Sequence, residues 1–131
     1  MKELTKEWIK KAERDAGTAT RESSVEIDAN WDAVCFHAQQ AVEKYIKGLL
    51  QEKEIPFSRT HDLSVLLKLL LPLFAELSVL IDDIEWLSAF AVEFRYPGEE
   101  AVEEDARRAL EIMDRILLLL RGIIPKSEHT K

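Results

Sequence analysis

The chain of 131 residues is short enough to form one domain and long enough to bury a core without disulfides. Hydrophobic residues make up 47% and charged residues 33% of it, which excludes a disordered chain and suits a soluble helical protein. The net charge of -7 argues against broad nonspecific binding to nucleic acid, because such binding requires a basic surface. We expect a single domain over residues 1–125, followed by a polar tail over residues 126–131.

Neither a membrane span nor a signal segment is expected. The longest apolar run, Leu69 to Ala75, contains Pro72 and is far shorter than the ~20 residues of a membrane-spanning helix. The N-terminus is charged and amphipathic, so we expect a cytoplasmic protein. The single cysteine, Cys35, excludes an intramolecular disulfide, and its place on an apolar helix face favours a buried structural thiol over a nucleophile.

The first half of the chain predicts two helices. Apolar residues at helical spacing predict the first from about Leu4 to Glu22 and the second from Trp31 to about Lys53. Either Asp28 or Asn30 can cap the second helix. The second helix has the clearest apolar stripe and is expected to be central: Trp31, Val34, Cys35, Ala38, Val42, Tyr45, Ile46 and Leu49.

A third helix is expected from Leu63 to about Leu71, interrupted at Pro72 and then resumed to Ile81. Either Thr60 or Asp62 can start it. The stretch from residue 66 to residue 80 contains more apolar residues than one face of a small bundle requires, which favours a dimer or partner contact.

Two further helices complete the pattern. Asp82 and Asp83 favour the start of a fourth helix that runs to Phe94, and a fifth is expected from about Glu99 to Arg121. Neither an internal repeat nor an alternating strand pattern is found. The sequence therefore predicts an all-α, up-and-down bundle of four to five helices.

A polar row flanks the stripe of the second helix. His37, Ala41, Lys44 and Gly48 follow one another at steps of three and four residues, and Gln40 lies beside them. A glycine inside a good helix costs about 1 kcal/mol, so a close approach to its backbone is expected. The row favours either tight packing against a neighbouring helix or a polar cleft.

Arg59, Thr60, His61 and Asp62 lie at the expected start of the third helix. The free N–H groups of a helix start suit a phosphate, but a capping side chain would satisfy the same groups. The three histidines, His37, His61 and His129, show no spacing typical of metal ligands, and no cofactor is expected.

Three stretches together resemble the HEPN family, named for its occurrence in higher eukaryotes and prokaryotes and for nucleotide binding. They are CFHAQQAVEKYIKGLL at residues 35–50, RTHDL at residues 59–63 and FRYPG at residues 94–98. The resemblance covers nearly the whole chain and implies a HEPN-like bundle that usually forms a homodimer, with a polar cleft near the dimer interface. It also implies a minimal nucleotidyltransferase as partner, the two acting as a prokaryotic toxin–antitoxin pair.

The resemblance also allows this sequence to be compared with the ribonuclease signature of the family. Many HEPN proteins are metal-independent ribonucleases whose signature is an arginine followed a few residues later by a histidine. Arg95 matches the arginine, whereas Glu99, Glu100 and Ala101 occupy the positions of the histidine. An arginine can stabilise the phosphorane but cannot accept the proton of the attacking hydroxyl, so cleavage would require a displaced histidine, His37 or His61.

Arg95 can instead pair with Glu93 or Asp62, or point a free guanidinium at a phosphate. The neighbouring Tyr96 is expected to pack its ring against the bundle, while Pro97 and Gly98 end the helix.

These observations lead to three alternative functions. The first is a domain that binds a nucleotide or RNA phosphate in a polar cleft as a homodimer or higher homo-oligomer. The second is a ribonuclease that uses Arg95 and a displaced histidine, and the third is a noncatalytic helical adaptor. Arg95 and His37 are the candidate catalytic residues. The candidate binding residues are His37, Lys44, Arg59, His61, Arg95 and Tyr96.

Overall fold

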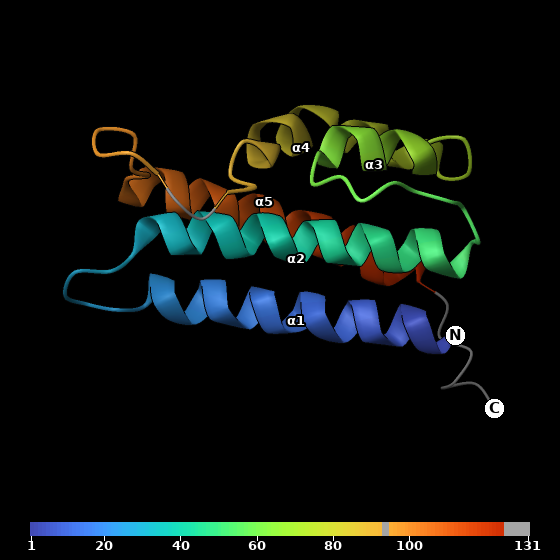
Figure 1. The fold of residues 1–131 in the computed structure, drawn as a ribbon, viewed down its shortest axis with the longest axis horizontal. Helices are drawn as coiled ribbons and strands as arrows, with labels where there is room; N and C mark the ends of the chain where they lie inside the picture. The colour runs from blue at the N-terminus through green and yellow to red at the C-terminus, as the bar shows by residue number, and fades with distance from the viewer. Residues whose placement is uncertain (93–94, 125–131) are drawn as a thin grey trace.

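The computed structural model describes residues 1–92 and 95–124, which form an antiparallel helical bundle (Figure 1). Its elements are α1 (Glu3–Ser23), α2 (Trp31–Glu52), α3 (Leu63–Leu70), the 3₁₀ helix η1 (Ala75–Leu80), α4 (Ile81–Ser88) and α5 (Glu103–Ile123). The described residues contain no strand. The predicted all-α bundle is confirmed, and the tail predicted at 126–131 lies outside the described residues.

The second helix is central, as its apolar stripe predicts. α2 contacts α1, α3, α4 and α5, and Figure 1 shows α1 beside it on one flank with α3 and α4 on the other. The side chain of Asn30 accepts a hydrogen bond from the N–H of Ala33 at 3.0 Å, so Asn30 rather than Asp28 caps α2. The stripe is buried in the core at Val34, Cys35, Ala38, Val42, Tyr45, Ile46 and Leu49.

Small residues let α1 lie close to α2. The buried face of α1 consists of Ala12, Ala16 and Ala19 together with Thr5. A Cβ atom added at Gly48 would lie 3.2 Å from the Cβ of Trp8, which is tighter than ordinary van der Waals contact. The close approach expected at Gly48 is therefore confirmed, and the group that approaches is α1.

The third helix is capped as predicted but ends earlier. The Asp62 carboxylate accepts hydrogen bonds from the N–H groups of Ser64 and Val65 at 2.9 and 3.4 Å. The α-helix does not resume after Pro72, because proline has no N–H to continue the hydrogen-bond ladder. The chain turns there and continues as η1, so the predicted interruption is confirmed and the helix that resumes is a 3₁₀ helix.

The next two helix boundaries differ from the predicted ones, and a contact with another segment lies at each. α4 ends at Ser88, and the carbonyl of the next residue, Ala89, accepts a hydrogen bond from Arg95 at 2.7 Å. The end predicted at Phe94 lies outside the described residues. α5 begins at Glu103 rather than Glu99, since the N–H of Ala101 donates to the Asp32 carboxylate on α2 at 2.7 Å and keeps the preceding residues out of the helix.

The surplus of apolar residues predicted between residues 66 and 80 is confirmed. Leu66, Leu70 and Leu77 are buried, but Leu73 is 56% exposed and Val79 is 74% exposed. Within the part of the chain that the structure describes, every helix is too short or too polar to span a membrane.

The tight α1–α2 contact predicts a large effect of side-chain volume at Gly48. Gly48→Val should lower the free energy of unfolding by about 1 to 3 kcal/mol, because the added methyl groups force α1 away from α2. The matched control is Gly122→Val on α5, where an added Cβ meets no atom within 4 Å. Urea denaturation followed by circular dichroism measures both, and equal effects would contradict the packing role of Gly48.

Candidate functional site

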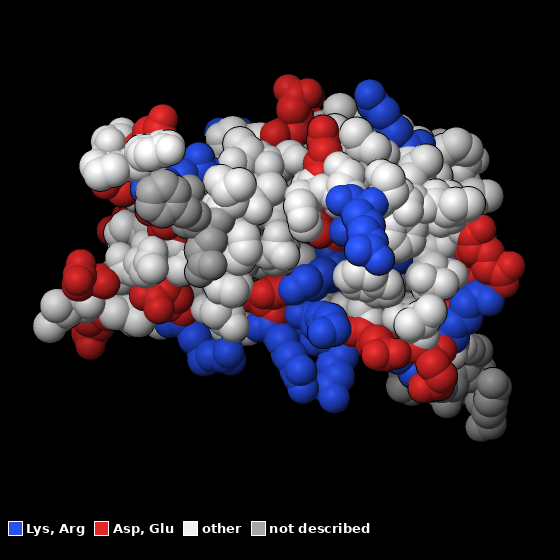
Figure 2. Space-filling view, viewed as in Figure 1, with Lys and Arg blue, Asp and Glu red and all other residues white. Residues whose placement is uncertain are grey.

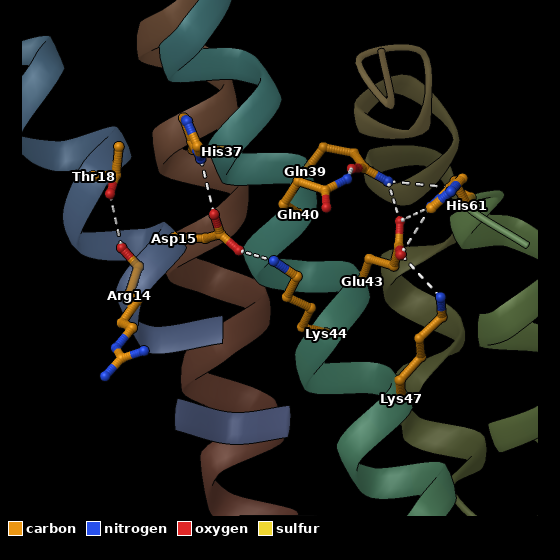
Figure 3. Close-up of polar contacts among 10 residues, drawn as sticks. All are labelled: Arg14, Asp15, Thr18, His37, Gln39, Gln40, Glu43, Lys44, Lys47 and His61. Carbon is orange, nitrogen blue, oxygen red and sulfur yellow. Dashed lines mark hydrogen bonds and ion pairs between the residues drawn. The ribbon is translucent and has the colours of Figure 1, made fainter. Parts of the chain in front are cut away.

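Two polar clusters flank α2, each built around a carboxylate that bridges a histidine and a lysine (Figure 3). The first cluster consists of Asp15 from α1 with His37 and Lys44 from α2. The second cluster consists of Gln39, Glu43 and Lys47 from α2 with His61 from the α2–α3 connection.

The first cluster joins α1 to α2. One oxygen of Asp15 lies 2.8 Å from His37 Nδ1, and the other accepts from Lys44 Nζ at 2.6 Å. The carboxylate is only 12% exposed, whereas the side chains of His37 and Lys44 are about one quarter exposed. Because an ionised carboxylate can only accept, Nδ1 of His37 carries the shared proton and Nε2 is the free ring nitrogen.

The second cluster is more deeply buried at its centre and more open at its edge. Glu43 is 3% exposed and accepts from Lys47 Nζ at 2.9 Å and from His61 Nδ1 at 3.0 Å. Lys47 is itself only 7% exposed and lies over the Trp8 ring, 5.6 Å from its centroid. The His61 side chain is 65% exposed. The protein therefore buries the ion pair and presents the imidazole.

Two neighbouring glutamines extend the second cluster along α2. Gln39 donates to the Glu43 carboxylate and to the backbone carbonyl of His61, both at 3.2 Å. Gln40 donates to Gln39 at 2.7 Å and lies between the two clusters in Figure 3. We call the two clusters together with Gln40 the α2 polar surface.

Lys and Arg side chains gather near this surface. Figure 2 shows them over the middle of α1 and α2, although the chain as a whole has a net charge of -7. Within the two clusters themselves, the charges of Lys44 and Lys47 are matched by those of Asp15 and Glu43. Arg59 is exposed in the connection that leads to His61.

The start of α3 does not offer free N–H groups to a phosphate. Asp62 accepts from the N–H groups of Ser64 and Val65, and the Ser88 hydroxyl accepts from that of Leu63 at 2.9 Å. The capping interpretation is confirmed at this helix start, and a phosphate at these N–H groups is excluded because they already have acceptors.

The hydrogen bond between the Leu63 N–H and Ser88 joins the start of α3 to the end of α4, where Arg95 also binds. Ser88 binds the first N–H of α3, and the next carbonyl, that of Ala89, accepts from the Arg95 guanidinium at 2.7 Å. Arg95 also lies over the Phe90 ring, 4.9 Å from its centroid. It thus helps to hold the end of α4, which the sequence does not predict.

The structure can be compared with the predicted carboxylate partners of Arg95 and with the predicted position of Tyr96. Within the described residues Arg95 forms no ion pair with Asp62, and Glu93 lies outside those residues. Tyr96 is 67% exposed, so most of its side chain lies at the surface, and the packing of its ring stays a prediction. Tyr96 begins a surface turn in which the Glu99 N–H donates to the Tyr96 carbonyl at 2.9 Å.

Comparison with known proteins decides the family. The model of the HEPN domain matches residues 5–123, which is most of the chain. The chain belongs to the HEPN family. Its fold is similar to that of ST0689, described as an archaeal HEPN homologue, with a TM-score of 0.74, 29% identity, and coverage of 95% of this chain and 100% of that chain.

A second similar fold is found in TT1696 from Thermus thermophilus. The TM-score is 0.72 at 21% identity, and the match covers 92% of this chain and 98% of that chain. No curated protein sequence is significantly similar to the chain.

Sequence reasoning missed the carboxylates of this candidate site and the buried lysine beside one of them. Asp15 contacts the predicted residues His37 and Lys44, and Glu43 contacts the predicted His61. Lys47 is the counter-ion of Glu43. Glu43 and Lys47 are four residues apart on a helix, and this spacing could have predicted their ion pair. The sequence indicates a contact of Asp15 less clearly, through its position at the edge of the alanine face of α1.

Cys35 takes no part in this surface. It is fully buried, and burial raises the pKa of its thiol to about 12. The buried structural role expected for Cys35 fits this environment, because a protonated thiol is a poor nucleophile.

Removal of one partner of the buried Glu43–Lys47 pair should strongly destabilise this HEPN protein. Glu43→Gln leaves the Lys47 charge buried without a counter-ion, so we expect the free energy of unfolding to fall by about 3 kcal/mol. The control is Glu103→Gln in the exposed pair with Arg107, where we expect less than about 0.5 kcal/mol. Chemical denaturation of both variants checks this, and similar small losses would contradict it.

The raised pKa of Cys35 predicts a loss of stability at high pH. The unfolded thiol ionises near pH 8.5, whereas the folded thiol keeps its proton up to about pH 12. The stabilisation is therefore complete below pH 8.5 and declines as the pH rises toward 12. Urea denaturation at several pH values should show the advantage of the wild type over Cys35→Ala shrinking in this range, and a constant difference would contradict the assignment.

Proposed function

We propose that this HEPN protein binds a nucleotide or RNA phosphate on the α2 polar surface, as a noncatalytic or weakly catalytic domain. The observation that carries the proposal is the His61 imidazole. Its side chain is 65% exposed, while its Nδ1 is held by a carboxylate that is only 3% exposed. A ring fixed at one nitrogen by the protein presents the other nitrogen, Nε2, to a ligand.

The charges around His61 suit an anion. The negative charge of Glu43 is balanced inside the protein by Lys47, so that it does not act as an uncompensated charge against an approaching phosphate. A protonated His61 can then donate from Nε2 to a phosphate oxygen, which is a charge-assisted hydrogen bond.

The other binding residues predicted from the sequence extend the proposed site. Lys44 keeps a quarter of its side chain exposed beside Asp15, and Arg59 is exposed two residues before His61. His37 occupies the first cluster with its Nε2 free for a ligand. Arg95 and the exposed Tyr96 follow α4, whose last residue is hydrogen-bonded to the start of α3. Together these residues would contact both the phosphate and the sugar or base attached to it.

The partners are also proposed. Membership of the HEPN family supports a homodimer that works with a minimal nucleotidyltransferase in a toxin–antitoxin system. The exposed side chains of Leu73 and Val79 support a contact with another chain, because large apolar side chains grouped at a surface favour association.

Metal-independent RNA cleavage is the second candidate, and one observation favours it. A carboxylate that holds Nδ1 of an exposed histidine is the arrangement of a general base, with Nε2 directed at the proton it accepts. His61 would take the role that the missing signature histidine has in the family, and Arg95 would stabilise the phosphorane.

Calorimetry with a nucleoside triphosphate and with a short RNA, both in EDTA, tests the proposal. His61→Gln and Arg59→Gln should each weaken binding by about tenfold or more, because each removes a charge-assisted hydrogen bond. The control is Arg107→Gln, which changes the net charge as Arg59→Gln does but removes an arginine already paired with Glu103, and which should leave binding nearly unchanged. Binding that is absent in the folded wild type, or equal in all variants, would contradict the site.

Gel analysis of the same RNA separates the two candidates. Intact RNA after incubation supports binding alone. Cleavage that is lost in both His61→Gln and Arg95→Gln supports the ribonuclease, whereas cleavage that survives both substitutions comes from another protein.

A further inference from the structure

We infer that Trp86, Phe90, Arg95 and Arg108 form a platform for single-stranded RNA, and we call these four residues the Arg–aromatic platform. This inference deepens the proposed function and rests on it for the class of ligand, because it assigns an RNA strand rather than a lone nucleotide to the protein. The platform residues come from α4, from the connection after it and from α5.

The platform alternates guanidinium groups with rings. The Arg108 guanidinium carbon lies over Trp86 at 4.2 Å from the ring centroid. The Trp86 and Phe90 centroids are 5.0 Å apart in an edge arrangement, and Arg95 lies over Phe90 at 4.9 Å. Both rings are partly buried against the core, so they hold the two arginines in fixed positions while part of each ring stays at the surface.

The two platform arginines form no ion pair with a carboxylate of the described residues, as is also true of Arg14, Arg21 and Arg59, but only the platform arginines lie over aromatic rings. Arg107, Arg115 and Arg121 each form an ion pair with a carboxylate. Within residues 1–92 and 95–124, neither Arg95 nor Arg108 does so, although the chain contains 25 acidic residues. Their positive charges are therefore available to an external anion.

This combination fits an RNA strand. Guanidinium planes and aromatic rings accept unstacked bases of any sequence, and guanidinium groups also bind phosphate in a bidentate way. Two cation–ring units in a row can engage successive nucleotides, whereas a mononucleotide can occupy one unit only. The platform should therefore favour a strand over a single nucleotide.

The platform also leads toward the proposed phosphate site. Arg95, at one end, donates to the carbonyl of Ala89. The preceding residue, Ser88, accepts from the N–H of Leu63, which lies two residues after His61. A strand bound on the platform would thus leave it beside the segment that carries His61.

Fluorescence anisotropy with a labelled oligouridylate of about ten nucleotides tests the platform. Arg108→Gln should weaken RNA binding by about tenfold or more, since it removes one stacking and phosphate-binding unit. Arg107→Gln is the matched control: it is the adjacent arginine on α5, is paired with Glu103, and should cost less than about twofold. Equal losses in the two variants, or no RNA binding by the wild type, would overturn the inference.

Two further measurements separate the role of the planar guanidinium from that of its charge, and the platform from the proposed phosphate site. Arg108→Lys keeps the charge and the contact with Trp86 but loses the planar group, so its RNA affinity should fall several-fold, and an unchanged affinity in this folded variant would overturn the platform. Calorimetry of the wild type and His61→Gln with uridine monophosphate tests the proposed function separately, because only the phosphate site depends on His61. If the monophosphate shows no His61-dependent binding but RNA binding depends on Arg108, the phosphate site fails and the platform stands; the reverse pattern overturns the platform alone.

Discussion

Two carboxylates largely removed from water, that of Glu43 on α2 and that of Asp15 on α1, impose the constraint on which the rest of the site depends. A charge removed from water must be neutralised and hydrogen-bonded, and each carboxylate meets this requirement with one lysine and one histidine. The Asp15 group ties α1 to α2, and the Glu43 group ties the α2–α3 connection to α2. The same contacts decide which nitrogen of each imidazole faces the ligand side, so stability and the proposed binding chemistry share their residues.

The departure from the HEPN ribonuclease signature has a structural counterpart. The chain keeps an arginine at the expected place, but Glu100 and Ala101, where the histidine would lie, serve the turn before α5. Glu100 accepts from the Gly98 N–H at 2.7 Å, and Ala101 donates to Asp32 on α2. Arg95 itself rests on Phe90 rather than on a carboxylate of the described residues. Its position suits contact with an RNA strand, and any proton transfer would fall to another residue.

Patterns within one helix could be read from the sequence. The apolar stripe of α2 and the small residue at Gly48 follow from helical periodicity and helix propensity, both of which act over a few residues. Candidate caps could be found in the same way, although the choice of Asn30 over Asp28 required the structure.

Contacts between different segments could not be predicted in this way. The contact of Arg95 at the end of α4 and the contact of Asp32 before the start of α5 each join a helix boundary to a residue outside that helix. The carboxylate partners of His37 and His61 are separated from them by 22 and 18 residues along the chain, so only tertiary structure shows that each histidine has a buried acidic partner.

The most direct test of the account is a long-range nitrogen–proton NMR spectrum of the histidine rings, recorded while a nucleotide is added. For the neutral rings of His37 and His61 we expect the proton on Nδ1, because each carboxylate accepts from that atom. Nucleotide addition should then shift the Nε2 signal of His61 with little change at its Nδ1. A proton found on Nε2 of His61, or a ring that does not respond to saturating nucleotide, would contradict the central claim that Glu43 presents His61 to a phosphate.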